Sequence, residues 1–398
     1  MGQHADDILN RALQQIRNAC TDQGILAGII DADNYRRIWA RDGIVGGLAG
    51  ILSDDRTIID GLGNTLSTLW NARDQKLGTI PSNVDPNNDQ ASFGSLVGRV
   101  DATTWFLVGA AQYIMQSKDF SGLEFLQKDI KKEFKLLSAW EFNGKHLIYT
   151  PMSGNWADEY PYHGYLLYDN LLYFWAASLW GDLLNNHELK LKAHNIKTAI
   201  TINFWMTPDL LPKAYHKGLY ERNLEDQPPY FICGFHPGGI FKRFDAAGNA
   251  LALILGFYSK EQLAALQDYL ASLWSQESLA GFIPAFWPTI DEHDEDWTAI
   301  ATNYNYQFKN QPHHFHNGGI WPVWMGLTAL GLRMNGLISE ADKIQDRYKA
   351  FLVSEDFAFS EYIESQFFTG KGQKPLTYSA SGYVFCSCKH FSNLVTKK

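Results

Sequence analysis

The 398-residue chain lacks the features of a nucleic-acid or membrane protein. It has 34 Lys and Arg against 43 Asp and Glu, a net charge of −9, whereas binding to a phosphate backbone needs clustered basic side chains. No apolar run reaches the roughly 20 residues of a membrane-spanning helix. The polar, acidic start MGQHADDILN does not resemble a signal peptide. We therefore expect neither nucleic acid nor membrane among its partners.

Cysteine is scarce, and linker sequences are absent. The chain has four cysteines and no Pro-, Gly- or Ser-rich linker. Cys386 and Cys388 are one residue apart, which does not fit the C-x-x-C pairs of redox or zinc sites. Thiols without a pairing pattern are typical of a reducing compartment, so we expect free cysteines and a cytoplasmic location.

Aromatic residues, in contrast, are abundant. They make up 14% of the chain and include 13 Trp, an excess that suits sugar binding, because Trp and Tyr combine a flat apolar face with a polar edge. The stretch GNWADEYPYHG (154–164) places two adjacent acids among four rings. A core strand would not tolerate the acids, because an unpaired buried charge is costly. The stretch therefore indicates a binding or catalytic site.

Apolar residues recur at every third or fourth position over long stretches, which predicts helices. Six of these stretches follow a polar segment that ends in an acid or in glycines, at intervals of 57 to 87 residues. The segments are WARDG (39–43), GRVDA (98–102), NWADEY (155–160), KRFDA (242–246), HNGGIW (316–321) and KPLTYSASGY (374–383). Each interval holds two helices and their loops, which indicates a repeated helical hairpin. We predict an all-α fold: one (α/α)6 barrel over residues 1–398, with short strands in the rim loops and all six segments on one rim.

Some acids in these segments have a simpler explanation as helix N-caps. Asp is among the best N-cap residues, and it also suits the helix dipole. Asp42, Asp101 and Asp245 could each serve in this way. A cap does not need the tryptophans that accompany the segments, so we favour a role in binding.

Glycoside hydrolysis needs two carboxyl groups on opposite sides of the scissile bond, one protonated and one ionised. Asp158 fits the acid, because apolar rings beside a carboxyl raise its pKa. Glu361, ahead of the sixth apolar helix, is the candidate base. Glu364 is the local alternative, and spacing alone does not separate the two glutamates.

The remaining segments offer partners for sugar hydroxyls, which need donors and acceptors in fixed positions. Arg41 can pair with Asp42, and Arg243 with Asp245, while Trp287 can form a platform. The predicted substrate-binding residues are Trp39, Arg41, Asp42, Asp101, Trp156, His163, Arg243, Asp245, Trp287, His316, Asn317 and Trp321.

With these residues assembled, the chain resembles the neutral/alkaline invertases, glycoside hydrolase family 100. It is more faintly similar to the (α/α)6-barrel α-glucosidases and glycogen-debranching enzymes. The resemblance runs in order through nearly the whole chain, and His-Asn-Gly-Gly-x-Trp-Pro within HFHNGGIWPVWMGL is its most specific match. The other matching segments are RIWARDGIVGGLAGIL, GRVDATTWFLVGAAQYI, NWADEYPYHGYLLYDNLLYFWAA, KRFDAAGNALALILGF and FSEYIESQFFTGKGQKPLTYSASGY.

The resemblance implies an enzyme that hydrolyses a small sugar substrate, with a sucrose-like disaccharide as the leading candidate and no cofactor. It implies that Asp158 is the general acid and that Glu361, rather than Glu364, is the base. It also implies substrate contacts from Arg41, Asp42, Asp101, His316 and Asn317. The chain departs from the family directly after the acid, where Glu-Tyr-Pro-Tyr replaces Arg-Arg-Met-Gly. That region shapes the leaving-group side of the site. The departure therefore bears on whether sucrose is the substrate, more than on whether the enzyme is a hydrolase.

Other interpretations remain open from the sequence. An α-1,6- or α-1,4-glucosidase acting on oligosaccharides would use the same residues. A sugar epimerase would use a histidine acid/base pair, for which His163, His313, His314 and His316 are available. A sugar-binding protein without activity would not need both carboxyls. A metal site in PHHFH (312–316) is not expected, because the spacing is irregular and no partner cluster is visible.

Overall fold

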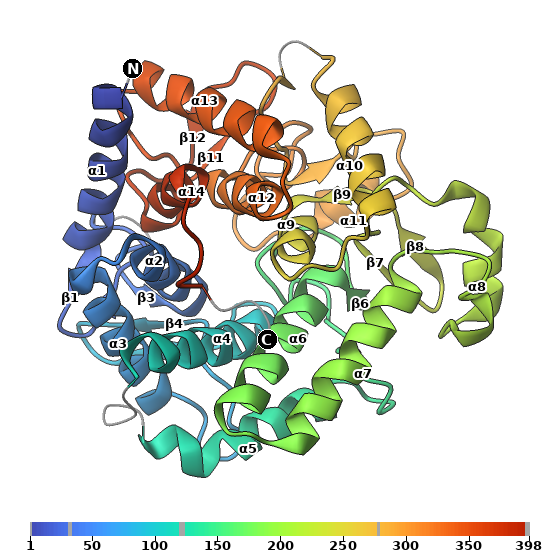
Figure 1. Cartoon of the computed structure of the whole chain (residues 1–398), viewed down its shortest axis with the longest axis horizontal. Helices are drawn as coiled ribbons and strands as arrows, with labels where there is room; N and C mark the ends of the chain where they lie inside the picture. Colours follow the sequence, from blue (N-terminus) through green and yellow to red (C-terminus); the bar gives the residue numbers. More distant parts are fainter. Residues whose placement is uncertain (1, 31–33, 119–123, 277–278, 395–398) are drawn as a thin grey trace.

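A computed structural model describes residues 2–30, 34–118, 124–276 and 279–394. Within this part of the chain, six helices form a closed inner ring (Figure 1). Each contacts the next, and the last contacts the first. They are α2 (Ala40–Ser53), α4 (Val100–Ser117), α6 (Leu167–Leu183), α9 (Ala246–Ile254), α12 (Pro322–Met334) and α14 (Thr377–Ser387).

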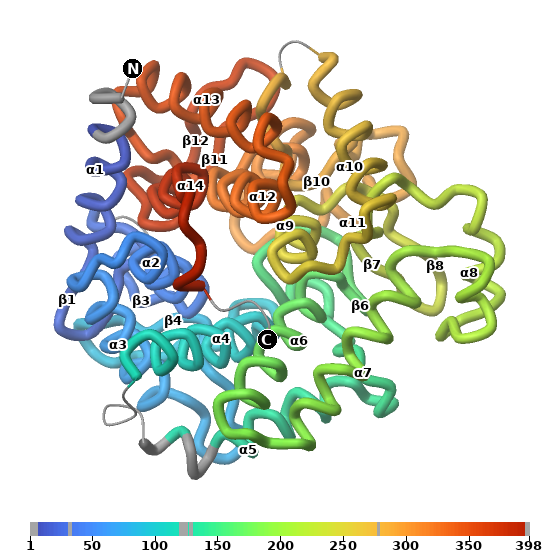
Figure 2. Tube along the Cα trace, viewed as in Figure 1, coloured from blue at the N-terminus to red at the C-terminus, as the bar shows by residue number. Residues whose placement is uncertain are grey.

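An outer set of helices surrounds this ring (Figure 1). It consists of α1 (Gly2–Ala19), α3 (Arg56–Asn71), α5 (Glu124–Ala139), α7 (His187–Asn203), α10 (Lys260–Leu273) and α13 (Ile338–Ser354). Helices α3, α7 and α13 pack on α2, α6 and α12, and α1 packs on α14. The trace alternates between the two rings along the chain (Figure 2). The predicted (α/α)6 barrel is confirmed.

The two rings differ in how their side chains are buried. In α4 every residue from Val100 to Gln112 is buried, as is every residue of α12 from Pro322 to Arg333. The outer helix α3 instead buries residues on one face, including Ile58, Leu62 and Leu66. A helix enclosed on all sides is apolar all round, whereas a covering helix carries one apolar stripe. This is the pattern that the sequence predicts.

Small residues let the inner helices approach closely. A Cβ atom on Gly382 of α14 would lie 2.3 Å from the carbonyl oxygen of Pro322 in α12. A Cβ atom on Gly326 of α12 would lie 2.1 Å from the carbonyl oxygen of Gly382. Both distances are far below van der Waals contact, so these two helices meet backbone to backbone.

Short strands of two or three residues lie in the loops. Two sheets have three strands: β3 (Ile38–Trp39), β4 (Asn83–Asp85) and β5 (Gln90–Ser92); and β6 (Tyr165–Leu166), β7 (Gly234–His236) and β8 (Gly239–Phe241). Antiparallel pairs are formed by β1 (Cys20–Thr21) with β2 (Gly24–Ile25), β9 (Phe244–Asp245) with β10 (Phe286–Trp287), and β11 (Tyr362–Ile363) with β12 (Gly370–Lys371). Single helical turns complete the loops: η1 (Leu211–Lys213), α8 (Lys217–Arg222), η2 (Leu224–Asp226) and α11 (Trp297–Thr302). Strands β3, β6 and β9 end directly before the inner helices α2, α6 and α9. As predicted, the strands belong to the loops between helices.

Among the described helices, none is both long and apolar enough to cross a bilayer.

Candidate active site

Charged side chains from the first two inner helices meet at one rim of the barrel. The Arg41 guanidinium donates to the Asp101 carboxylate at 3.1 Å and lies 3.9 Å from that of Asp42. Asp101 also accepts from the Tyr168 hydroxyl at 3.1 Å. Asp42 and Asp101 lie in the first turns of α2 and α4, but the N-cap positions belong to Trp39 and Arg99. These two acids are therefore network members rather than caps.

Asp158 lies in a loop that packs against the start of α4. Its side chain is 36% exposed, and its carboxylate accepts from the guanidinium of Arg99, which also donates to the Ser153 carbonyl. The Val100 amide donates to the Gly154 carbonyl at 2.7 Å, which fixes the loop on the helix. The partner of this acid is a cation rather than a ring.

The rings near Asp158 in sequence pack against one another instead. Tyr160 stacks on Phe286 with ring centroids 4.0 Å apart, Tyr162 stacks on Phe241 at the same distance, and Trp156 stacks on Phe286 at 5.7 Å. All three rings are buried. The expectation that they enclose the Asp158 carboxyl is wrong, because the three rings pack into the core while the Asp158 side chain stays partly exposed and bonds to Arg99.

Glu361 is buried and has a tyrosine partner that the sequence analysis missed. The Tyr35 hydroxyl donates to its carboxylate at 2.5 Å, and the Gln373 amide donates at 3.2 Å. Burial raises the pKa of Glu361 above its usual value of 4.5, although the Tyr35 hydrogen bond opposes that effect.

Tyr35 brings the candidate catalytic acids into one neighbourhood. Burial raises the pKa of its hydroxyl most, followed by the negative charges of Glu361, Asp42 and Asp158. Glu361 bonds to this hydroxyl directly, and the charges of Asp42 and Asp158 also act on it, although the three acids come from the first hairpin, the third hairpin and the approach to the sixth.

Glu364 faces away from this neighbourhood, into a turn. Its carboxylate accepts from the backbone amides of Gln366, Phe367 and Thr369 at 2.9–3.3 Å and from the Thr369 hydroxyl at 3.2 Å. Burial alone would raise its pKa, but these donors hold the pKa below its usual 4.5. Its acceptor sites are used to shape the turn.

His316 forms a wall of the rim together with tryptophans. Its ring stacks on Trp321 at 5.4 Å and meets the edge of Trp156 at 5.2 Å, and its Nδ1 has no hydrogen-bond partner among the described residues. Burial, then the charges of Arg41 and Lys309, lower its pKa well below 6.5. A neutral histidine held among cations does not suit the acid/base pair of an epimerase.

Two of the predicted substrate-binding side chains, those of Asn317 and Asp245, instead form hydrogen bonds to the backbone that stabilise the fold. The Asn317 amide bonds to both backbone groups of Ile290 and to the Asn310 carbonyl, all at 2.7–3.0 Å. Asp245 caps α9 through the Ala247 amide at 3.0 Å, and burial raises its pKa to about 7. The N-cap explanation therefore holds for Asp245.

The predicted Arg243–Asp245 pair does not form. Arg243 bonds instead to Asp294 and Asp296, and to the Tyr162 hydroxyl at 2.9 Å. The carboxyl of Asp245 lies in the core next to Cys233. The difference arises because the Asp245 carboxyl is turned inward to cap α9 and is buried, whereas the Arg243 guanidinium reaches the acids of the 294–296 turn.

The remaining predicted contacts are half-buried rim residues. His163 packs against His236 with ring centroids 4.7 Å apart, Trp287 lies 5.9 Å from the His313 ring, and the Trp39 indole donates to the Asn34 carbonyl. Trp39 lies in β3, directly before α2, and Trp287 lies in β10, which pairs with β9.

Several residues that hold the rim together were not predicted. Asn310 is fully buried, donates to the Glu159 carbonyl at 2.8 Å and accepts from the His316 amide at 3.0 Å, so it ties two polar segments together. Asp169 anchors the Asp158 loop through Asn155 and Thr150, both at 2.9 Å. A buried polar residue with backbone partners has no local sequence signal, which explains the omission.

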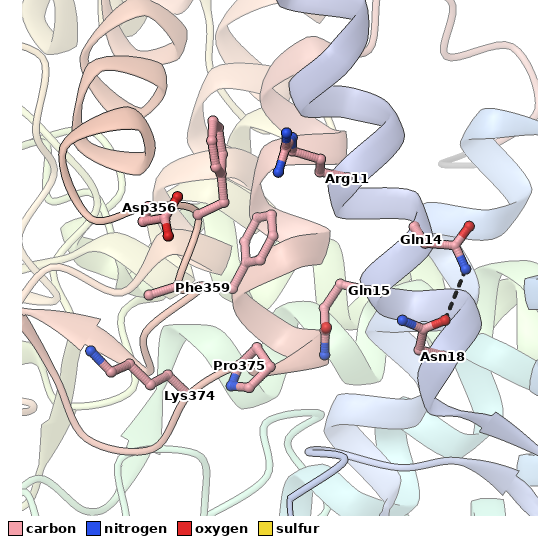
Figure 3. A pocket seen from close by; sticks show the side chains of 10 residues that line it. Arg11, Gln14, Gln15, Asn18, Asp356, Phe359, Lys374 and Pro375 are labelled. Carbon is pink, nitrogen blue, oxygen red and sulfur yellow. Dashed lines mark hydrogen bonds between the residues drawn. The ribbon is translucent and has the colours of Figure 1, made fainter.

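Two cavities lie at different places on the molecule. One of about 690 Å³ is lined in part by Arg99, the partner of Asp158. The other, of about 430 Å³, lies between one face of α1 and the segments around Phe359 and Lys374 (Figure 3). None of the predicted site residues lines the second cavity. None of them lines the first cavity either, but that cavity adjoins the candidate active site through Arg99.

No group of three or more His, Cys, Asp or Glu side chains with metal-binding geometry occurs in the described ranges. The four cysteines are unpaired.

The family model for alkaline and neutral invertases matches residues 168–392. This range includes Glu361 and begins ten residues after Asp158. Chloroplastic neutral/alkaline invertase 3 of Oryza sativa subsp. japonica is 23% identical over 416 residues, covering 88% of this chain and 66% of the relative. Probable alkaline/neutral invertase D of Arabidopsis thaliana is 29% identical over 160 residues, covering 39% of this chain and 28% of the relative. The chain thus spans less than two thirds of the length of these relatives.

Among solved structures, the GH63 mannosylglycerate hydrolase of Thermus thermophilus in complex with Tris and D-glycerate superposes with a TM-score of 0.66. The identity is 12%, and the match covers 95% of this chain and 99% of that one. At this identity the likeness concerns the fold, and it agrees with the (α/α)6 barrel. Since the family model covers more than half of the sequence, the chain belongs to the alkaline and neutral invertase family.

Proposed function

We propose that the protein is a glycoside hydrolase that cleaves an α-glucoside with inversion, and that a sucrose-like disaccharide is the leading substrate. The observation that carries the proposal is the buried Glu361 carboxylate, which accepts from the Tyr35 hydroxyl at 2.5 Å, a hydroxyl on which the charges of Asp158 and Asp42 also act. Family membership supports the same class of reaction.

In this mechanism Asp158 is the general acid. It gives its proton to the glycosidic oxygen as the bond from the anomeric carbon to that oxygen breaks, and the leaving group departs as an alcohol. Its exposure at the rim suits contact with a bound substrate. Arg99 donates a hydrogen bond to one oxygen of Asp158 and so sets the direction of the carboxyl group.

Glu361 is the general base and acts through a water molecule. It removes a proton from the water as the oxygen attacks the anomeric carbon, so water is consumed and glucose is released. The Tyr35 hydrogen bond favours the ionised carboxylate that this role needs, and it orients the oxygen. The two carboxyls carry both proton transfers, so the proposal requires no cofactor.

Arg41, Asp42 and Asp101 are the proposed binders of the glucosyl hydroxyls, with Trp321 and His316 as the apolar wall. Donors and acceptors of both signs lie within one network, as hydroxyl recognition requires. We propose that one barrel domain carries the activity and that the protein is cytoplasmic.

The test is a substrate panel with products resolved by anomer. Sucrose, maltose, isomaltose, trehalose and aryl α-glucosides are supplied, and NMR follows the first product before mutarotation. Initial β-glucose supports inversion by Asp158 and Glu361. Initial α-glucose, or a glycosyl ester trapped on Glu361, overturns the mechanism. A panel without turnover overturns the activity.

A further inference from the structure

The cavity of about 690 Å³ beside Arg99 has an unusual lining. Its size falls within the roughly 300–1,000 Å³ of small-molecule sites. It lies between the start of α4, the segment after α5 and the tip of the β7–β8 hairpin. Its lining residues are Thr79, Gly98, Arg99, Val100, Trp140, Phe142, Tyr149, Pro151 and Pro237.

Aromatic side chains form one side of this groove. Phe142 is 79% exposed, and its ring meets the edge of Tyr149 at 6.3 Å. Tyr149 in turn meets Tyr165 edge-on at 5.2 Å, and its backbone amide donates to the Trp140 carbonyl at 3.0 Å. The exposed ring of Phe142 is held in place by the row of tyrosines behind it, and it presents an apolar face to which a ligand can bind.

The groove meets the candidate acid at Arg99. The side chain of Arg99 is 7% exposed and lines the groove, and its guanidinium bonds to the Asp158 carboxylate. Pro151 continues the wall into the loop that carries Asp158. A leaving group attached to the oxygen that Asp158 protonates would thus lie at the mouth of the groove.

The chemistry of the lining differs from that of the glucosyl network. No carboxylate and no side-chain amide occurs among the nine lining residues, and Arg99 is the permanent charge. Around Arg41, by contrast, two carboxylates face one guanidinium. A second sugar ring with many hydroxyls would find few acceptors here, whereas a flat apolar group would find rings and prolines.

We propose that this groove binds the leaving group of the substrate, and that the preferred leaving group carries a flat apolar part, as in an aryl glucoside. The inference rests on the proposed inverting α-glucosidase function and specifies its leaving group: on this point the groove favours an aryl α-glucoside over the sucrose-like disaccharide. Aromatic contacts from Phe142 and Trp140 would favour a flat apolar leaving group. Arg99 lies between this groove and Asp158, next to the bond that is cleaved.

The test compares binding and turnover of ligands that differ in the leaving group. Titration calorimetry measures the Kd of phenyl and methyl 1-thio-α-glucoside, which resist hydrolysis, on the intact protein. We expect the phenyl compound to bind about 3- to 10-fold more tightly, the range for one or two aromatic contacts. Phe142→Ala should remove most of this ratio, and Phe142→Tyr should retain it. Because Phe142 is exposed, truncation leaves the core intact.

Phe367→Ala is the matched control, since Phe367 is 74% exposed and lies outside the groove. It should leave the phenyl-to-methyl ratio unchanged. Equal binding of the two thioglucosides, or a ratio insensitive to Phe142→Ala, would overturn the inference while hydrolysis of α-glucosides still stands. A phenyl preference without turnover of any α-glucoside would instead overturn the proposed catalytic function.

Discussion

Glu361 and Glu364 lie three residues apart on the same segment, and both are buried, yet their surroundings are opposite. The carboxylate of Glu364 accepts four hydrogen bonds from its own turn, which lower its pKa. That of Glu361 accepts from Tyr35 and the Gln373 amide, and burial raises its pKa. Burial alone therefore does not decide what a carboxylate does. A group whose acceptor sites are used by its own loop stabilises structure, whereas a buried carboxylate with fewer donors and a raised pKa is available for proton transfer.

The largest effect should come from Glu361→Gln. The amide has nearly the same shape but cannot take a proton from water, so kcat should fall by about 10³-fold. Steady-state kinetics on the best substrate of the panel measures the loss. Glu364→Gln is the matched control and should retain most of the activity. Equal losses in the two variants would contradict the contrast between these glutamates.

Tyr35→Phe should have an intermediate effect. It removes a hydrogen bond that favours ionised Glu361, so kcat/KM should fall about 10-fold. The base must be ionised, so activity is lost as pH falls through the pKa of Glu361. Without Tyr35 that pKa rises further, and the acidic limb of the pH profile should move to higher pH. If the acidic limb of the Tyr35→Phe profile stays at the same pH, the Tyr35 hydrogen bond does not control the ionisation of the catalytic base.

Glu364→Gln should act on stability rather than on rate. Replacing a carboxylate that accepts from three amides should lower the free energy of unfolding by about 1–3 kcal/mol near neutral pH. Because the folded-state pKa is depressed, this stabilisation is present above about pH 4.5 and is lost as pH falls through the folded-state pKa. Urea unfolding of both proteins across that window checks the sign. A difference that grows on acidification would refute it.

The fold could be predicted from the sequence because its signal is repeated. Six polar segments, each followed by an apolar helix, recur along the chain, and each predicted segment precedes an inner helix. The site was harder to predict. Asp158 was selected for the rings beside it, but those rings are core residues and its partner is Arg99, 59 residues earlier.

Partners that are distant in sequence account for the other differences. Tyr35 bonds to Glu361 across 326 residues, and Asn310 joins the Glu159 backbone to the turn at His316. Arg243 was assigned to its near neighbour Asp245 but bonds to Asp294 and Asp296. Proximity in sequence does not decide such pairs, because the Asp245 carboxyl is already used to cap α9 in the core.

The closure of the inner ring by α14 has a consequence for synthesis of the protein. Thr377, at the start of α14, donates to the carbonyls of Leu26 and Ala27 at 2.7 and 2.9 Å, about 350 residues away in the chain. Until this segment leaves the ribosome, α2 and α12 each lack a neighbour, and their apolar surfaces face water. The ring must therefore close after translation of its last helix. Contacts of such long range make folding slow, and the incomplete ring is prone to aggregation until its last helix is in place.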